Sequence, residues 1–268
     1  MRFQRELTAG VLIPGVLAVV VAAPTWAFAL LVVAAAGLAL LEFFAMLTEA
    51  GLTIPKAAGL LLFAALVGAA HLARLDALVW AVGAALLVLP TLVLFSSSSV
   101  PALLPSAAAS AFATLYVGAG GAAVVGLRSR GWQPVLFLLA VVWAGDSAAY
   151  YVGRRWGKRK LAPVVSPKKT WEGFWGQMAG GTAAGAAAAA LSAGPSRLLV
   201  GAGLGAGLSA VAVVGDLVES TFKRSCDVKD SGALLPGHGG LLDRLDSLLY
   251  AAPFLYGALL LLPGTLLR

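Results

Sequence analysis

The residues best suited to chemistry lie between Ser220 and Asp246, in an otherwise strongly apolar chain. Apolar segments long enough to span a bilayer flank this stretch on both sides. Placing many charges between two membrane helices is costly unless the charges meet a ligand, a metal ion or each other. We therefore expect the active site here. The ionisable residues of this cluster include Lys223, Arg224, Lys229, Asp230, His238, Asp243, Arg244 and Asp246.

Two polar stripes with helical spacing border the charged stretch. The first stripe comprises Asp216, Glu219, Ser220 and Lys223, and the second comprises Asp243, Asp246, Ser247 and Tyr250. If both stripes lie on helices, Asp216 and Asp243 can come together. Carboxylate oxygens are ligands that Mg²⁺ prefers, and the phosphates of a nucleotide would complete its octahedron. The spacing therefore predicts a metal site at Asp216 and Asp243.

Groups suited to phosphate binding lie in two loops. Gly239 and Gly240 belong to a glycine-rich connection whose backbone N–H groups can approach a phosphate closely. The earlier segment SerProLysLysThrTrpGluGly offers the Ser166 hydroxyl and the Lys169 ammonium to phosphate oxygens. Simpler explanations stay open, because the glycines can serve only a turn and Thr170 can be an ordinary helix N-cap.

Two acidic residues fall within apolar segments. Asp146 lies inside a predicted membrane helix, where a carboxylate costs about 2.5–3.5 kcal/mol on insertion scales. It shares one helix face with Tyr150 and Gly153, and we include it among the candidate substrate-binding residues. Glu42 lies in the chemically quieter front half. A functional role is open for Glu42, but an interhelical hydrogen bond or an interfacial position is favoured.

The composition excludes a soluble globular domain. Of the 268 residues, 60% are hydrophobic and only 12% are charged, about half the charged fraction usual in soluble domains. The fold class is therefore all-α, a polytopic integral membrane bundle. The net charge of +7 does not indicate nucleic-acid binding, because the basic residues lie in loops between apolar spans. The single cysteine excludes an internal disulfide.

A spanning helix needs about 20 mostly apolar residues, and on that measure we expect about nine spans. They are Leu7 to Ala22, Trp26 to Leu47, Ala57 to Leu72, Ala77 to Phe95, Ala102 to Val125, Gln133 to Val152, Gly173 to Leu191, Leu198 to Val218 and Leu245 to Leu262. With the N-terminus inside, most of the 19 Lys and Arg residues face the cytoplasm. Those left outside are Arg74, Arg128, Arg130, Arg197 and Arg268.

Most acidic residues lie in the back half of the chain. We therefore expect N-terminal membrane helices over residues 1–130, which face lipid or mediate dimerisation. A catalytic membrane region with two charged cytoplasmic loops is expected over residues 131–268.

The charged stretch resembles the signature of the phosphatidate cytidylyltransferase (CDP-diacylglycerol synthase) family. The pattern reads Ser220-x-Phe-Lys-Arg-x4-Lys229-Asp-x-Gly-x3-Pro236-x-His-Gly-Gly-x2-Asp243-Arg-x-Asp246. The segments AspSerAlaAlaTyr and SerProLysLysThrTrpGluGly resemble the same family in the same order. The resemblance covers the back half, and the front half is similar only in being apolar and helical.

The resemblance implies an integral enzyme of the cytoplasmic membrane, often dimeric, with its active site facing the cytoplasm. Such an enzyme transfers CMP from CTP to phosphatidate with Mg²⁺, and K⁺ is a possible second cation. The family's paired metal-binding aspartates correspond to Asp216 and Asp243. The expected partners are CTP, phosphatidate, bilayer lipid and a second copy of the chain, and no nucleic acid.

Catalysis would depend on positioning and charge neutralisation, because the attacking phosphate is already anionic. The expected catalytic residues are Asp216, Lys223, Asp243, Arg244 and Asp246. The expected substrate-binding residues are Asp146, Ser166, Lys169, Ser220, Arg224, Lys229, Asp230, His238, Gly239 and Gly240.

Two other functions remain open at the level of sequence. One is a related CTP-dependent kinase or cytidylyltransferase that acts on another membrane lipid. The other is an ion or phosphate transporter with a polar pathway through Asp146 and Asp216. Transporters commonly have repeated halves with broken helices. Here the charge is concentrated in one half, which favours an enzyme.

Overall fold

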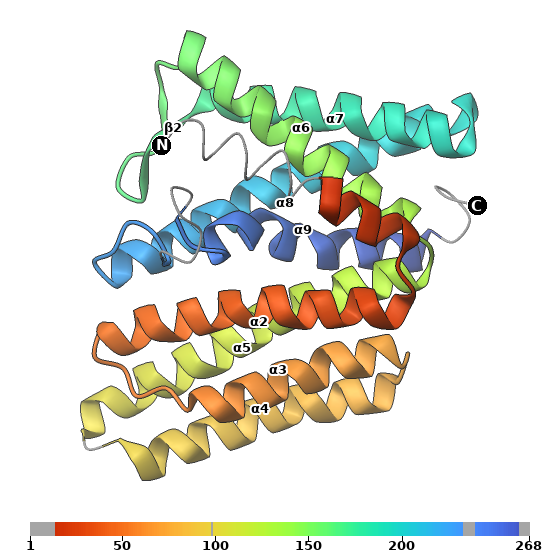
Figure 1. Cartoon of the computed structure of the whole chain (residues 1–268). Coiled ribbons are helices and arrows are strands. Elements are labelled where there is room, and N and C mark those ends of the chain that lie inside the picture. The colour runs from red at the N-terminus through yellow and green to blue at the C-terminus, as the bar shows by residue number, and fades with distance from the viewer. Residues whose placement is uncertain (1–13, 98, 233–238, 263–268) are drawn as a thin grey trace. The chain divides into compact units, whose positions relative to one another are not determined.

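The computed structural model describes residues 14–97, 99–232 and 239–262, and these residues are predominantly helical (Figure 1). Residues 14–22 are helical and precede the first labelled helix. The helices are α2 (Thr25–Glu49), α3 (Lys56–His71), α4 (Leu75–Ser96), α5 (Val100–Ser129), α6 (Gln133–Trp156), α7 (Trp171–Ala193), α8 (Leu198–Ser225) and α9 (Leu242–Leu261). A short 3-10 turn, Pro195–Arg197, precedes α8.

The predicted apolar segments coincide with helices of the structure, which confirms the all-α class. For the first segment, only its part from residue 14 is described. In the described chain, five helical segments are long and apolar enough to cross a membrane: Thr25–Glu49, Leu75–Ser96, Val100–Ser129, Gln133–Trp156 and Pro195–Ser225. α3 is apolar but shorter. The chain is thus a polytopic membrane protein, and the larger expected count of spans is not confirmed.

The chain divides into two compact units. The first unit comprises residues 1–129 together with Lys223–Leu245, and the second comprises Arg130–Phe222 together with residues 246–268. The sequence-based division near residue 130 stays a prediction. The charged segment from Lys223 to Leu245, however, is grouped with the front helices.

In the first unit, α2, α3, α4 and α5 pack around large apolar side chains. Phe43, Phe44 and Phe63 are almost completely buried. Gly59 of α3 lies so close to α2 that an added Cβ would be 2.5 Å from the Phe44 ring. Small residues of this kind let helices approach closely where the surrounding lipid provides no hydrophobic driving force.

In the second unit, small residues bring the helices into backbone contact. Cβ atoms added at Gly176 and Gly180 of α7 would lie 2.8 Å from Val152 and 2.6 Å from Ala148 of α6. A Cβ on Gly205 of α8 would lie 2.4 Å from a backbone oxygen of α7. The first two close approaches hold α7 against α6, and the third holds α8 against α7.

α8 and α9 lie side by side in the second unit at two glycine positions. A Cβ on Gly207 would lie 2.6 Å from the Phe254 ring, and one on Gly215 would lie 2.4 Å from Tyr250. Gly215 directly precedes Asp216. The second contact therefore places this acidic end of α8 against the part of α9 that follows Asp246.

The segment between α6 and α7 forms a small antiparallel hairpin, a feature that the sequence did not predict. Strand β1 (Lys160–Ala162) pairs with β2 (Ser166–Thr170), with Lys160 opposite Thr170 and Ala162 opposite Ser166. The Thr170 hydroxyl then accepts a hydrogen bond of 3.1 Å from the Gly173 N–H, which confirms the N-cap of α7.

Candidate active site

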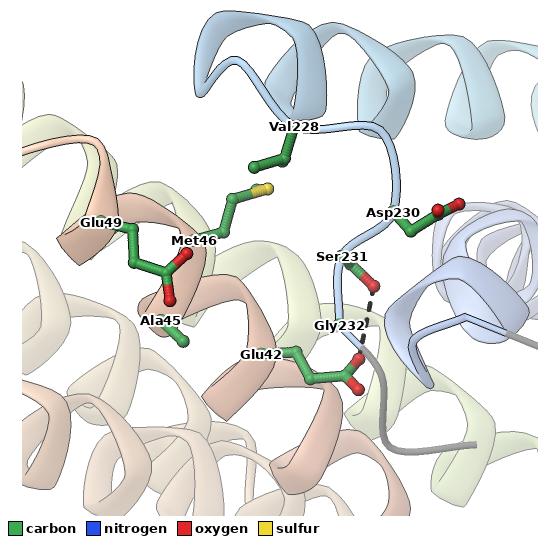
Figure 2. Close-up of a pocket in the computed structure, with 8 residues that line it drawn as sticks. All are labelled: Glu42, Ala45, Met46, Glu49, Val228, Asp230, Ser231 and Gly232. Atoms are coloured by element: carbon green, nitrogen blue, oxygen red, sulfur yellow. Dashed lines mark hydrogen bonds between the residues drawn. The ribbon is translucent and has the colours of Figure 1, made fainter. Parts of the chain in front are cut away.

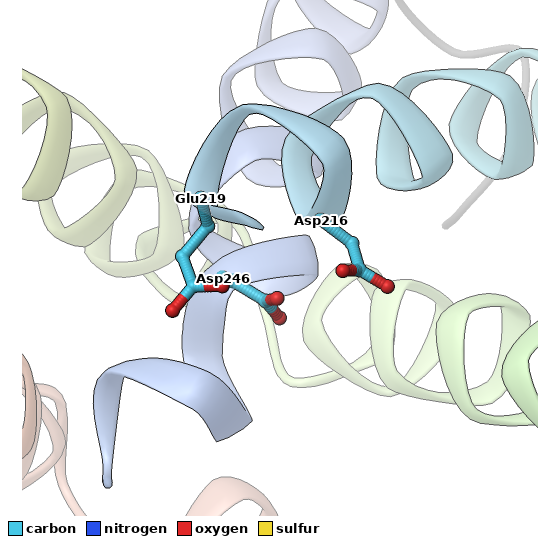
Figure 3. Close-up of side chains that lie close together, drawn as sticks. All are labelled: Asp216, Glu219 and Asp246. Atoms are coloured by element: carbon cyan, nitrogen blue, oxygen red, sulfur yellow. The ribbon is translucent and has the colours of Figure 1, made fainter. Parts of the chain in front are cut away.

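Three carboxylates converge where α8 meets α9 (Figure 3). Asp216 and Glu219 come from α8 and Asp246 from α9, and one oxygen from each lies within 4.8 Å of the others. Glu219 is 2% exposed and Asp246 is 9% exposed, whereas Asp216 is partly open. In an octahedron with ligands at about 2.1 Å, ligand oxygens lie about 3 to 4 Å apart. The cluster therefore needs only a small closure to hold a divalent cation.

The carboxylate of Asp216 joins this cluster to the hairpin. Lys169 of β2 places its Nζ 2.6 Å from Asp216 Oδ2, and the Ser220 hydroxyl donates a 3.3 Å hydrogen bond to Asp216 Oδ1. The hairpin register therefore orients a predicted phosphate-binding lysine toward a predicted metal ligand. A lysine in this position offsets one negative charge of the cluster and offers an ammonium group to an anionic ligand.

Another acidic residue of this unit, Asp146, is held by an amide. Gln177 of α7 donates a 3.0 Å hydrogen bond from Nε2 to Asp146 Oδ1, and Gln177 itself is 7% exposed. Gly145 allows this contact, since an added Cβ would lie 3.1 Å from Gln177. The amide thus fixes the orientation of the Asp146 carboxylate.

The backbone before β1 is also anchored. The Glu172 carboxylate accepts hydrogen bonds from the N–H groups of Lys158 and Arg159, at 3.1 Å for Lys158. Its own backbone N–H and these two groups hold the pKa of Glu172 below its ordinary value. Nearby, Arg159, Lys160, Trp171 and Trp175 line an open pocket of about 330 Å³. This basic and aromatic surface suits an anionic headgroup or phosphate.

In the first unit, both oxygens of the Asp243 carboxylate bind donors. Its Oδ1 lies 2.6 Å from Lys223 Nζ, and its Oδ2 accepts the N–H groups of Ser231 at 3.1 Å and Gly240 at 2.9 Å. Burial raises the pKa of Asp243, but the hydrogen bond and the charge of Lys223, with the two backbone donors, outweigh it. The pKa therefore lies below its ordinary value. Asp243 is therefore ionised at neutral pH, and it binds the two described ends of the loop that connects Ser231 to Leu242.

The whole chain matches a known family. The model that describes the Cytidylyltransferase family matches residues 3–262. The chain belongs to the cytidylyltransferase family. This result confirms the resemblance drawn from the charged signature.

The relatives compared next are each named phosphatidate cytidylyltransferase. The chain is 55% identical over 131 residues to the phosphatidate cytidylyltransferase of Pseudomonas aeruginosa, covering 48% of each protein. It is 44% identical over 130 residues to that of Bacillus subtilis, again covering 48% of each. For Staphylococcus aureus the identity is 41% over 140 residues, covering 52% of this chain and 54% of the relative. The chain thus spans about half the length of the relatives it matches.

Of the predicted metal pair, only Asp216 belongs to the carboxylate cluster. Asp216 lies with Glu219 and Asp246 in the second unit, whereas Asp243 belongs to the first. Joint metal binding by Asp216 and Asp243 involves both units and stays a prediction. The pattern of three- and four-residue spacing already placed Glu219 on the same stripe as Asp216, so the signal for Glu219 was present.

The other predicted site residues have varied surroundings. Arg224 donates a 2.9 Å hydrogen bond to the Val228 carbonyl. Lys229, Asp230 and Arg244 are exposed, and Ser166 is partly buried. Gly239 has a φ of +79°, a conformation that favours glycine. His238 lies outside the described residues.

Gln177 was not predicted, because nothing in the small-residue sequence of α7 marks an amide as the partner of an acid on α6. Its position becomes meaningful only when the two helices are packed together.

Proposed function

We propose that this chain transfers CMP from CTP to phosphatidate, giving CDP-diacylglycerol and pyrophosphate. The observation that carries the proposal is the carboxylate cluster of Asp216, Glu219 and Asp246, with Lys169 paired to Asp216 at 2.6 Å. A cation held between these acids, beside the Lys169 ammonium group, would suit a triphosphate. The names of the relatives support cytidylyl transfer to phosphatidate.

The cation would be Mg²⁺, held by Asp216, Glu219 and Asp246, because the donor set consists entirely of carboxylate oxygens. When bound, Mg²⁺ offsets the negative charge of the triphosphate and its leaving pyrophosphate. Asp243 remains a predicted ligand and K⁺ a proposed second cation.

The chain's own residues would bind and orient the two phosphates. An oxygen of the phosphatidate phosphate forms a bond to the α-phosphorus of CTP, and the bond from that phosphorus to the bridging oxygen breaks as pyrophosphate leaves. The nucleophile is already anionic, so no residue has to remove a proton. We propose that Lys169 moves from Asp216 to a phosphate oxygen when CTP binds.

Other predicted residues keep supporting roles in the proposal. Lys223, Arg224, Lys229 and Arg244 would offset phosphate charge, and Ser166, Ser220, Asp146, Asp230, His238, Gly239 and Gly240 would contact or position substrate. The distribution of apolar and basic residues supports roughly nine spans and an active site that faces the cytoplasm. The proposed homodimer rests on the family resemblance alone.

The direct test is pyrophosphate release by the purified protein in detergent with CTP, phosphatidate and Mg²⁺. The test variant is Asp216→Asn, which keeps the side-chain shape and removes the charge. Asp227→Asn is the matched control, because Asp227 is an exposed loop acid with a φ of +58°, which asparagine also adopts.

We expect release only when both substrates are present, strong loss in Asp216→Asn and wild-type rates in Asp227→Asn. Release with another membrane lipid but not with phosphatidate would contradict the proposed substrate. No release with any lipid from a folded protein would contradict the proposed reaction.

A further inference from the structure

Glu42 connects the front helices to the charged loop within the first unit. Its Oε2 accepts a 2.9 Å hydrogen bond from the Leu242 N–H. The same oxygen accepts a 3.3 Å hydrogen bond from the Ser231 hydroxyl, drawn as a dashed line in Figure 2. Leu242 is the first residue of α9. The side chain of Glu42 therefore bonds to the loop and to the first residue of another helix, α9, so it makes the interhelical hydrogen bond favoured from the sequence.

The two ends of the loop from Ser231 to Leu242 are held by two carboxylates. Glu42 binds the Ser231 side chain and the Leu242 N–H, while Asp243 binds the Ser231 N–H and the Gly240 N–H. Ser231 thus donates to both acids, and neighbouring positions at the far end of the loop donate one bond to each. This double attachment fixes the loop ends and the first turn of α9 at the same time.

Two glycines are required for Glu42 to come this close. A Cβ on Gly232 would lie 2.6 Å from Glu42 Oε1, and a Cβ on Gly240 would lie 2.6 Å from Glu42 Oε2 and 2.1 Å from the Ser231 hydroxyl. All three distances are shorter than real Cβ contacts. The glycines of the signature therefore accommodate a carboxylate from α2, which is a reason for them independent of phosphate binding.

Glu42 also lines a pocket of about 280 Å³ between α2 and the loop, together with Glu49, Asp230, Ser231 and Gly232 (Figure 2). Glu49 lies on the same helix and is exposed, and neither Ser231 nor Leu242 donates a hydrogen bond to it. Helix α2 thus contributes to the pocket one carboxylate that holds the loop and one that does not. That difference supplies a matched pair for experiment.

We propose that Glu42 is a positioning residue of the enzyme: by holding Ser231 and Leu242 it sets the conformation of the two described loop ends, residues 231–232 and 239–242, and of Asp243. The inference rests on the proposed cytidylyl transfer. Glu42 touches neither substrate nor cation in this account. It acts through the Asp243–Lys223 pair, whose Nζ–Oδ1 distance is 2.6 Å, and through the helix start that precedes Asp246.

The test compares Glu42→Gln with Glu49→Gln in two measurements. Hydrogen exchange, followed by mass spectrometry on peptides covering Ser231 and Gly240 to Asp243, reports the loop directly and needs no catalytic activity. Steady-state pyrophosphate release gives kcat and the KM for CTP. A thermal unfolding curve shows whether each variant is folded. A third variant, Ser231→Ala, removes only the hydrogen bond from the Ser231 hydroxyl to Glu42.

In Glu42→Gln we expect faster exchange in these peptides and a kcat lower by about 10- to 100-fold, since small misplacement of reacting groups has effects of this size. The KM for CTP should change much less. Ser231→Ala should show the same changes to a smaller degree, and combining it with Glu42→Gln should add little. Glu49→Gln should behave like wild type in both measurements.

Unchanged exchange in Glu42→Gln would overturn the inference, and so would faster exchange with an unchanged kcat. A wild-type protein that releases no pyrophosphate would contradict the proposed function, while the exchange measurement would still decide whether Glu42 holds the loop.

Discussion

Lys169 Nζ lies 2.6 Å from Asp216 Oδ2, and this ion pair joins the β-hairpin to the acidic end of α8. The lysine side chain is 23% exposed and the aspartate side chain 38% exposed, so the pair is accessible from solvent. In the proposed reaction, an arriving triphosphate can therefore compete for the ammonium group while a cation competes for the carboxylate. The pair is suited to exchange partners when substrate binds.

Replacing Lys169 should separate its role in binding the triphosphate from its competition with the cation for Asp216. In Lys169→Gln we expect kcat/KM for CTP to fall by about 10- to 100-fold, the range for losing a hydrogen bond to a charged group. The Mg²⁺ concentration needed for half-maximal activity should stay the same or fall, because Asp216 loses a competing cation. Lys168→Gln is the control, since Lys168 is an exposed neighbour on the same strand. Equal losses in both variants would contradict a specific role for Lys169.

The pairing of Lys223 with Asp243 predicts a pH effect. A carboxyl group with a lowered folded pKa stabilises the protein above its unfolded pKa of about 3.9. That stabilisation is lost as pH falls through the lower folded pKa. In Lys223→Met the burial that raises the pKa of Asp243 remains and its main opposing partner is gone. The acid-induced loss of stability should then begin at a higher pH.

The measurement is the unfolding temperature in detergent from about pH 6 down to about pH 3, a range that covers normal carboxyl titration. Lys229→Met controls for the loss of one exposed positive charge in the same loop. Identical pH profiles for Lys223→Met and Lys229→Met would show that the Lys223–Asp243 pair does not set the acid response.

Close helix packing in the second unit gives a stability prediction. Gly205→Ala places a methyl group 2.4 Å from the Gly181 carbonyl oxygen, so the helices must move apart. We expect destabilisation of about 1–3 kcal/mol, as for other overpacked sites. Gly203→Ala on the same helix meets nothing within 4 Å and should be neutral or slightly stabilising. Thermal unfolding of the two variants in one detergent checks this difference, and equal unfolding temperatures would contradict it.

The helices could be predicted from sequence because each is an apolar segment of nearly membrane-spanning length. The hairpin could not be predicted, since β1 contains only three residues and its partner strand includes a proline and two lysines. Its register, which carries Lys169 to Asp216, depends on pairing and on the Glu172 contacts with the preceding backbone.

The sequence predicted which acidic residues share a helix face but not which of them meet across helices. Helical spacing placed Asp243 and Asp246 on one face of α9, and Asp216 and Glu219 on one face of α8. Spacing alone cannot say which carboxylates meet, because that depends on the relative depth of the two helices. The same limit applies to Glu42, whose partners Ser231 and Leu242 are distant in sequence.

The most direct test of the central claim is the Mg²⁺ dependence of pyrophosphate release in Glu219→Gln. Glu219 belongs to the carboxylate cluster by geometry, and Asp227→Asn again supplies an exposed acid as the control. We predict that half-maximal activity in Glu219→Gln requires at least about tenfold more Mg²⁺, a typical result of weakening a metal site. An unchanged Mg²⁺ requirement in a folded, active Glu219→Gln protein would contradict the assignment of this cluster as the metal site.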